Sequence, residues 1–369
     1  MFLACVLKGF WAREVWSQKQ GFAMKVGLLI SRSGPAGLWG PSCDTGAMLA
    51  VAEINAAGGV LGRQVELVIA DAGWSETEAI MAAGTLVDID GVHAVVGMHP
   101  SNVRDAIRRR LAGSVPYVYT PQYEGGERNP YTVATGGTDD EMLGPGIAWL
   151  SEKRKARRFF LVGNDYVWPR RAHQCAREIV HAAGGKIVGE AFPSFGLGNH
   201  REILDQIRKA RPDVVVMALL GSEAASFNRA FSKAGLAAGI LRFGLAIDES
   251  VLYAIGAEHS ENLYVALNYF SGVQSAANDR FLETYHDCFG EYAPPVNQAC
   301  QSCYDGVNVV ANLARSIGRW DAASLARSFR RPVARSAVRS TLLKTPMGPT
   351  LKVHLAAAEG IEFKIVASH

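Results

Sequence analysis

Residues 92–111, VHAVVGMHPSNVRDAIRRRL, contain in one stretch the unit that decides the fold. The apolar first part predicts a buried strand over 92–97, and a helix is predicted from about Ser101 to Leu111. A strand that leads through a short segment into a helix is the βα unit of parallel sheets. The rest of the chain can therefore be searched for copies of this unit.

The same alternation continues on both sides of this unit. In the first half, strands are predicted at 25–31, 64–71, 92–97 and 116–120, with helices at about 42–57, 75–88 and 101–111. The pattern then restarts with strands at 158–163, 186–191, 213–219, 240–246 and 262–269 and helices at 140–152, 169–183, 199–210 and 222–234. Further helices follow at about 275–289, 297–317 and 321–330, and a strand pair at about 348–366. Repeats of this kind specify two parallel, doubly wound sheets in an α/β protein.

Short aromatic and polar segments stand where several predicted strands end. They are residues 97–101 (GMHPS), 119–125 (YTPQYEG) and 163–170 (GNDYVWPR). In open α/β sheets, ligands bind outside the carboxyl ends of the strands. We therefore expect these segments to converge on a cleft that holds a small polar molecule.

The composition is that of a globular protein with two lobes and a sizeable core. The chain has 369 residues, of which 49% are apolar and 20% charged, and its net charge is +3. The basic residues are scattered rather than gathered on one face, so direct nucleic-acid binding is not expected. No stretch of about 18 uninterrupted apolar residues follows the N-terminus, so no membrane insertion is expected.

The N-terminal residues 1–23 do not show the order of a secretory signal, which is a basic start, an apolar stretch and a small-residue cleavage site. Met24 stands directly before the first predicted strand. We therefore expect Met24 to be the natural start, residues 1–23 to be a disordered extension, and the protein to be cytoplasmic. A different start would make it periplasmic.

The sequence predicts no metal, cofactor or catalytic machinery. Cys300 and Cys303 lie in a helical apolar pattern and are predicted to pack in the core. The histidines lack metal-ligand spacing. The loop with Gly34 and Gly37 lacks the full glycine fingerprint of a dinucleotide site and is predicted to be a tight turn.

Five segments together resemble the type 1 periplasmic-binding-protein superfamily. They are GLLISRSGPAGLWG (27–40), AVVGMHPSNVRDAI (94–107), YTPQYEGGERNP (119–130), VGNDYVWPR (162–170) and NYFSGVQSAANDRF (268–281). Within that superfamily the chain is most similar to the amide- and urea-binding branch, which includes amide-sensing regulators and the binding proteins of urea transporters. The resemblance extends from about residue 25 to the end of the chain.

The resemblance implies two doubly wound parallel-sheet lobes joined by a three-strand hinge, with the ligand enclosed between them. The N-lobe would comprise residues 24–139 and 270–343, and the C-lobe residues 140–269 and 344–369. The binding residues expected on this basis are His99, Ser101, Tyr119, Gln122, Tyr123, Tyr166, Trp168 and Asp248. Ser101 at a helix start would meet a carbonyl or carboxylate oxygen, or serve only as a helix cap. The aromatic side chains would enclose a small planar group.

Some positions depart from the branch. His99 stands where the amide-sensing regulator has a tyrosine, and Ala246 and Ile247 replace two threonines. His99 together with the acidic pair Asp248 and Glu249 would suit a larger or partly cationic ligand, such as an amino acid or amidine. Glu124 and Arg170 have structural alternatives: Glu124 would bond a backbone turn, and Arg170 would pair with a carboxylate across the lobe.

The expected function is a hinge closure around a short amide, urea or amino-acid-like ligand, as in a cytoplasmic sensor. The partner implied by that resemblance is an RNA-binding antiterminator. The alternative is the substrate-binding component of an ABC uptake transporter for amides, urea or branched-chain amino acids, whose partner is a permease. A second alternative, an amidohydrolase, offers only Ser101 with His99 and no third orienting residue, so the protein is predicted not to be an enzyme. A homodimer is left open.

Overall fold

The computed structural model describes residues 23–329, 333–334, 342–343 and 351–369. Residues 1–22 of the predicted N-terminal extension lie outside these ranges. Residues 348–350, where the predicted C-terminal strand pair begins, lie outside them as well.

Five strands form a parallel sheet in the order β2-β1-β3-β4-β5. Their bounds are β1 Met24–Ile30, β2 Val65–Asp71, β3 Ala94–Met98, β4 Tyr117–Tyr119 and β5 Thr132–Ala134. The sequence prediction missed β5, because three residues at the end of a loop are too few to show a strand periodicity. The other four strands lie where the βα pattern predicts them.

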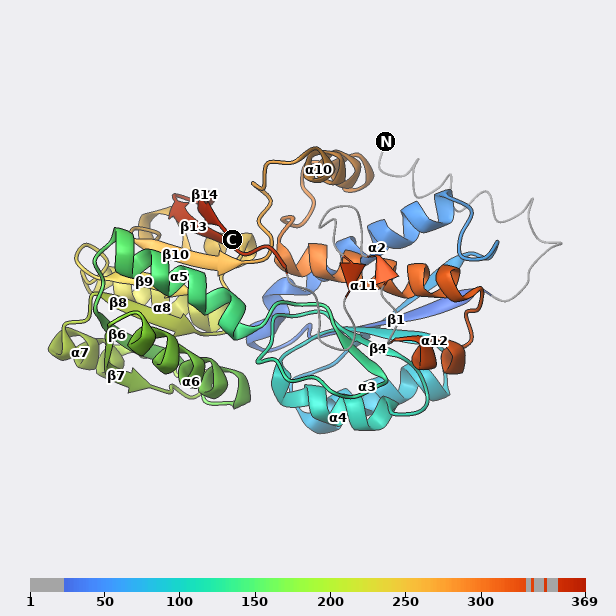
Figure 1. The fold of residues 1–369 in the computed structure, drawn as a ribbon, viewed down its shortest axis with the longest axis horizontal. Helices are drawn as coiled ribbons and strands as arrows, with labels where there is room; N and C mark the ends of the chain where they lie inside the picture. Colours follow the sequence, from blue (N-terminus) through green and yellow to red (C-terminus); the bar gives the residue numbers. More distant parts are fainter. Residues whose placement is uncertain (1–22, 330–332, 335–341, 344–350) are drawn as a thin grey trace.

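The helices around this sheet come from both halves of the chain. They are η1 Pro35–Trp39, α2 Gly40–Ala56, α3 Glu76–Asp88, α4 Ser101–Leu111, α10 Ala276–Phe289, α11 Gln298–Ile317 and α12 Ala322–Ser328. Figure 1 shows the orange α11 lying along the blue α2. Gly46 makes this close packing possible, because a Cβ atom there would lie 2.1 Å from the carbonyl oxygen of Cys300. Cys300 and Cys303 are both buried in the core, as the helical pattern predicts.

A seven-stranded sheet forms the second half, in the order β14-β13-β10-β9-β8-β6-β7. Its strands are β6 Arg158–Gly163, β7 Lys186–Ala191, β8 Val214–Ala218, β9 Leu241–Gly244, β10 Leu263–Leu267, β13 His354–Glu359 and β14 Glu362–Ser368. Its helices are α5 Asp139–Lys153, α6 Val167–Ala182, α7 Arg201–Ala210, α8 Gly221–Lys233, α9 Glu249–Ile255 and η2 Ala257–His259. The C-terminal pair β13 and β14 joins β10 in antiparallel pairing, so this sheet is mixed rather than purely parallel.

We call the five-stranded sheet with its helices the first lobe and the seven-stranded sheet with its helices the second lobe. The two lie side by side along the long axis of the molecule (Figure 1). A small hairpin of β11 Val333–Ala334 and β12 Leu342–Leu343 lies against α11. The chain passes between the lobes three times, from β5 to α5, from β10 to α10 and from β12 to β13, and part of the last pass lies outside the described residues. The α/β, two-lobed fold class predicted from the sequence is confirmed.

Candidate functional site

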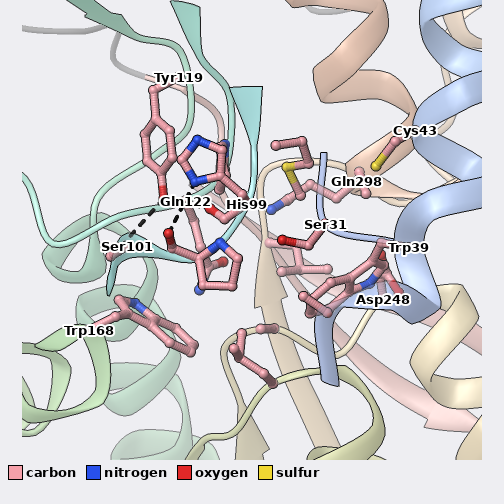
Figure 2. A pocket seen from close by; sticks show the side chains of 18 of the residues that line it. Ser31, Trp39, Cys43, His99, Ser101, Tyr119, Gln122, Trp168, Asp248 and Gln298 are labelled. Atoms are coloured by element: carbon pink, nitrogen blue, oxygen red, sulfur yellow. Dashed lines mark hydrogen bonds between the residues drawn. The ribbon is translucent and has the colours of Figure 1, made fainter. Parts of the chain in front are cut away.

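A cavity lies between the two lobes, where the strands of both sheets end. It contains about 670 Å³ of space not filled by atoms, including solvent at its mouth. His99, Ser101, Tyr119 and Gln122 line it from the first lobe, and Tyr166, Trp168 and Asp248 from the second (Figure 2). Cavities that combine apolar walls with a few polar groups are typical small-molecule sites. The structure thus brings together every predicted binding residue except Tyr123.

Ser101 is the first residue of α4, so it lies among the backbone N–H groups that have no partner within the helix. Its hydroxyl donates to Glu124 Oε2 at 2.9 Å, and Glu124 Oε1 accepts from Arg104 Nη2 at 3.0 Å. Since the hydroxyl proton points to a carboxylate, Ser101 Oγ presents its lone pairs to a ligand. Glu124, expected to bond a backbone turn, pairs with these two side chains instead.

His99 lines the cavity without offering a free ring nitrogen. Its Nδ1 lies 3.1 Å from the carbonyl oxygen of Pro100, to which only a protonated nitrogen can donate. Nε2 therefore accepts from the hydroxyl of Tyr117 at 2.6 Å. Burial lowers the pKa of His99 to about 4, so the ring is neutral at pH 7. The hydroxyl of Tyr119 donates to the carbonyl oxygen of His99 at 3.0 Å, which fixes both aromatic rings in the wall.

Gln122 is the polar side chain of the wall with the largest unmet hydrogen-bonding capacity. Neither Nε2 nor Oε1 of its amide has a partner within the described residues, and both atoms are buried. An unpaired buried polar group costs about 1–3 kcal/mol. A ligand group with both a donor and an acceptor would remove that cost.

The second lobe contributes an aromatic wall that reaches the rim of the cavity. Tyr166 caps α6, and Trp168 lies in the first turn of that helix. The indole N–H of Trp168 donates to Asp139 Oδ1 at 2.8 Å. The ring of Tyr166 lies 5.5 Å from that of Phe195, which meets Trp74 of the first lobe edge to face at 4.8 Å. The aromatic row therefore joins the two lobes.

Asp248 occupies another part of the wall, beside Trp39 (Figure 2). It caps α9, because its Oδ1 accepts from the backbone N–H of Val251 at 3.3 Å. Its neighbour Glu249 accepts from the N–H and the hydroxyl of Ser271 at 2.7 and 2.9 Å. Burial raises the pKa of Asp248 to about 6 and that of Glu249 to about 8. Asp248 therefore combines a helix-capping role with a place in the cavity wall.

Tyr123 is the predicted residue that the cavity excludes. It is buried, with its ring 6.3 Å from that of Tyr119 and 5.3 Å from the guanidinium of Arg104. Its backbone N–H donates to the carbonyl oxygen of Gly137, so the segment is extended and neighbouring side chains point to opposite sides. Because Gln122 faces the cavity, Tyr123 faces away from it.

Arg170 also differs from its expectation. Its Nη2 lies 2.6 Å from Asp165 Oδ1, five residues earlier in the same segment, rather than pairing across the lobe. Both side chains are about half exposed, so this ion pair contributes little to stability.

The wall residues that the sequence analysis missed include Ser31, Trp39, Cys43 and Gln298. Ser31 directly follows β1, so the strand-end rule applied to the first strand would have found it. Gln298 is the first residue of α11, and α10 stands between β10 and α11 in the chain. No local pattern around it indicates that it returns to the first lobe.

Within the described ranges, no group of histidine, cysteine and acidic side chains is arranged to hold a metal ion. No helix in that part of the chain combines the length and apolarity needed to cross a membrane.

Comparisons with known proteins agree with this geometry. The family described as periplasmic binding protein matches residues 23–352. The Leu/Ile/Val-binding protein homolog 7 of Brucella suis biovar 1 is 26% identical over 344 residues, which is 88% of this chain and 84% of that protein. The Leu/Ile/Val-binding protein BraC3 of Rhizobium johnstonii is 26% identical over 195 residues, and the match spans 52% of this chain but only about half (53%) of BraC3.

A solved structure with the same fold is LivJ of Streptococcus pneumoniae, a branched-chain amino acid transporter substrate-binding protein in complex with isoleucine. The TM-score is 0.84 at 22% identity, over 94% of this chain and 99% of LivJ. At that identity the likeness concerns the fold alone. The family match over most of the chain identifies the protein as a member of the periplasmic binding protein family, whose members are ligand-binding proteins rather than enzymes.

Proposed function

We propose that this protein is the ligand-capturing component of an ABC uptake system and closes around a small amino-acid-type molecule. The observation that carries the proposal is the cavity to which both lobes contribute polar and aromatic side chains. Relatives named Leu/Ile/Val-binding proteins and a similarly folded protein that holds isoleucine support this ligand class. They favour the transport alternative over the sensor expected from the sequence.

Closure would move the lobes as bodies, residues 24–139 with 270–343 against residues 140–269 with 344–369. A ligand stabilises the closed state only through contacts that the open state lacks. The two lobes also touch each other directly. The carbonyl of Pro35 approaches Gly221 so closely that a Cβ atom there would lie 2.0 Å from its oxygen.

The wall suits a small molecule with both polar and aliphatic parts. The N-terminus of α4 and the amide of Gln122 can donate to a carboxylate or amide oxygen. The wall also contains the apolar side chains of Met98, Leu220 and Leu267 and the polar side chains of Ser31, Asp248 and Gln298. An aliphatic amino acid fits this combination. A short amide or urea stays a second candidate, because the amide of Gln122 offers a free donor and a free acceptor together.

The partner under this proposal is the permease of an ABC transporter, which would meet the closed form in the periplasm. The family match favours the periplasm over the cytoplasmic location expected from the sequence. None of the relatives described above supports an RNA-binding antiterminator as partner.

A thermal-shift screen followed by calorimetry tests the proposal. The compounds are leucine, isoleucine, valine, acetamide and urea, because a ligand that binds only the folded state raises the unfolding temperature by mass action. At least one branched-chain amino acid is expected to raise it. A shift with urea or acetamide and with no amino acid would move the protein to the amide- and urea-binding branch. No shift with any compound would contradict the proposal.

A further inference from the structure

Three buried cysteines gather where α2 packs against α11. Cys43 lies on α2, and Cys300 and Cys303 lie one turn apart on α11, with exposed fractions of 1%, 0% and 0%. The other described cysteines, Cys175 and Cys288, lie on α6 and α10. Of the three buried thiols, that of Cys43 lines the cavity. The group therefore joins the packing of two helices to the wall of the site.

Contacts on either side of Cys43 show how closely the two helices approach. Asn297, which caps α11, donates from Nδ2 to Ser42 Oγ at 3.2 Å. A Cβ atom on Gly46 would lie 2.1 Å from the carbonyl oxygen of Cys300. Cys43 stands between Ser42 and Gly46 in the sequence, so its side chain lies where the backbones of α2 and α11 are close together.

The thiol of Cys43 faces that of Cys303. These two side chains are hydrogen-bonded to each other, whereas the thiol of Cys300 is bonded by the side chain of Thr45. A disulfide needs Cα atoms about 4.4–6.8 Å apart, which two helices reach only where small residues let them pack closely. Core packing accounts for the burial of these cysteines, but it does not require two of the thiols to touch.

We propose that Cys43 and Cys303 form a disulfide bond that joins α2 to α11 when the protein folds in an oxidising compartment. The inference rests on the proposed function for that compartment, because disulfides persist in the periplasm and are rare in the cytoplasm. The bond would hold two parts of the cavity wall together, Trp39 at the start of α2 and Gln298 at the start of α11. It would also close a long loop of the chain, which restricts the unfolded state.

The oxidant is a molecule that itself contains a disulfide, such as glutathione disulfide or an oxidised thiol–disulfide oxidoreductase. The thiolate of Cys43, after losing its proton to solvent, attacks one sulfur of the oxidant and displaces the other sulfur as a thiolate. The thiolate of Cys303 then attacks the Cys43 sulfur of this mixed disulfide and displaces the second thiolate. The two cysteines lose two protons and two electrons, and the oxidant becomes two thiols.

The bond is expected to form while the chain folds. In the folded, reduced protein, the hydrogen bond with Cys303 and burial raise the pKa of Cys43 well above its usual value. Only the thiolate is the nucleophile, so the folded thiol reacts slowly at neutral pH. In the unfolded chain a cysteine has its ordinary pKa of about 8.5 and reacts readily.

Refolding of the full chain with glutathione disulfide tests the bond. The protein, with its six cysteines, is unfolded and reduced, and it is then refolded at about pH 8 in mixed reduced and oxidised glutathione. Remaining thiols are alkylated, and peptides are analysed by mass spectrometry without reduction. We expect a peptide pair that joins Cys43 to Cys303, with Cys175, Cys288 and Cys300 alkylated.

The variants Cys303→Ala and Cys300→Ala form a matched pair, because each removes one fully buried thiol from the same helix. Circular dichroism checks that both fold. Cys300→Ala should form the bond, whereas Cys303→Ala should leave Cys43 alkylated. Dithiothreitol should lower the guanidinium chloride midpoint of the oxidised native protein and of Cys300→Ala, but not that of Cys303→Ala. A role in packing alone would not make the midpoint depend on the reductant.

Three results would overturn the inference. They are alkylation of every cysteine in a chain that regains the native circular dichroism spectrum, a bond from Cys43 to Cys300 instead, and a lower unfolding midpoint for the oxidised chain than for the reduced one. Failure of the proposed function would look different. If the purified chain forms the bond but acid-quenched cells contain Cys43 and Cys303 reduced, the pairing stands, and the periplasmic location and the transport role fail.

Discussion

Asn268 Oδ1 accepts a hydrogen bond from the backbone N–H of Gly137 at 3.1 Å and so ties together two of the segments that connect the lobes. The Nδ2 group of the same side chain donates to the carbonyl oxygen of Lys352 at 3.0 Å, in the third connection. The backbone N–H of Asn268 donates to Gln298 Oε1 at 2.8 Å, and Gln298 lines the cavity. One buried amide therefore links all three connections and adjoins the cavity wall.

Asn268→Ala should destabilise the protein by about 1–3 kcal/mol, because the buried N–H of Gly137 and the partly buried carbonyl of Lys352 lose this partner. At neutral pH, Asn268→Asp should destabilise the protein less than Asn268→Ala does, since the aspartate keeps an acceptor for Gly137 and loses only the donor to Lys352. Unfolding with guanidinium chloride measures both, with the exposed Gln174→Ala as reference. Equal stability of native protein and Asn268→Ala would show that this linkage contributes nothing.

Gly221→Ala should prevent full closure of the lobes. A Cβ atom at this position would lie 2.0 Å from the carbonyl oxygen of Pro35 in the other lobe, and the φ angle of +33° already disfavours a side chain. The clash can be relieved if the lobes separate. We expect ligand affinity to fall by roughly tenfold or more, which corresponds to at least about 1.4 kcal/mol. Small-angle scattering should show no compaction on adding ligand.

Gly239→Ala is the matched control for this variant. No heavy atom lies within 4 Å of a Cβ atom built there. The affinity of this variant for the ligand, and its compaction when ligand is added, should equal those of the native protein. Normal affinity in Gly221→Ala would mean that the Pro35 contact does not limit closure.

Tyr166→Ala should weaken ligand binding without unfolding the protein. The ring is a wall of the cavity and packs against Phe195, so truncation removes contact with the ligand and part of the rim. The loss of one such contact corresponds to about 1–3 kcal/mol of binding free energy. Calorimetry measures it, with Tyr253→Ala as control because Tyr253 is 49% exposed and does not line the cavity. A Tyr166→Ala variant with native affinity would exclude this residue from the site.

Glu249 should make the protein less stable as the pH rises. Burial, and after it Asp248, raises the pKa of Glu249 from 4.5 to about 8 in the folded protein. Between these values the folded state binds more protons than the unfolded state, so the free energy of unfolding falls as pH increases. The contribution is fully present below about pH 4.5, where both states are protonated. It is lost as the pH rises through that window towards 8.

The variant Glu249→Gln removes this titration. From pH 5 to pH 8 the native protein should lose roughly 3 kcal/mol of stability relative to the variant, since one pKa unit corresponds to about 1.4 kcal/mol. Unfolding with guanidinium chloride at both pH values measures the difference, and the exposed Glu178→Gln serves as control. Parallel pH profiles for native protein and Glu249→Gln would contradict the expectation.

Most of the fold could be predicted because its strands and helices follow from sequence patterns that extend over only a few residues. The βα unit at residues 92–111 appears in the structure as β3 followed by α4, and its helix begins at Ser101 and ends at Leu111 as expected. β5 was missed because three residues carry too little pattern. The antiparallel addition of β13 and β14 to the second sheet was missed as well, since pairing between distant strands leaves no local signal.

The candidate site could be predicted only in part. The rule that ligands lie beyond strand ends found Ser101, Tyr119 and Trp168, because strand ends are visible in the sequence. It also selected Tyr123, which faces away from the cavity. It did not find Gln298, the first residue of a helix that returns to the first lobe.

The sequence by itself therefore determined the alternation of strands and helices, the family resemblance and the segments that converge on a cleft. These follow from hydrophobic periodicity and short motifs, which act over a few residues. Only the tertiary structure decided which side chains share the cavity and how Asn268 joins the connections between the lobes. Side-chain direction, burial and pairing depend on segments far apart in the chain, and the packing of the two lobes sets them.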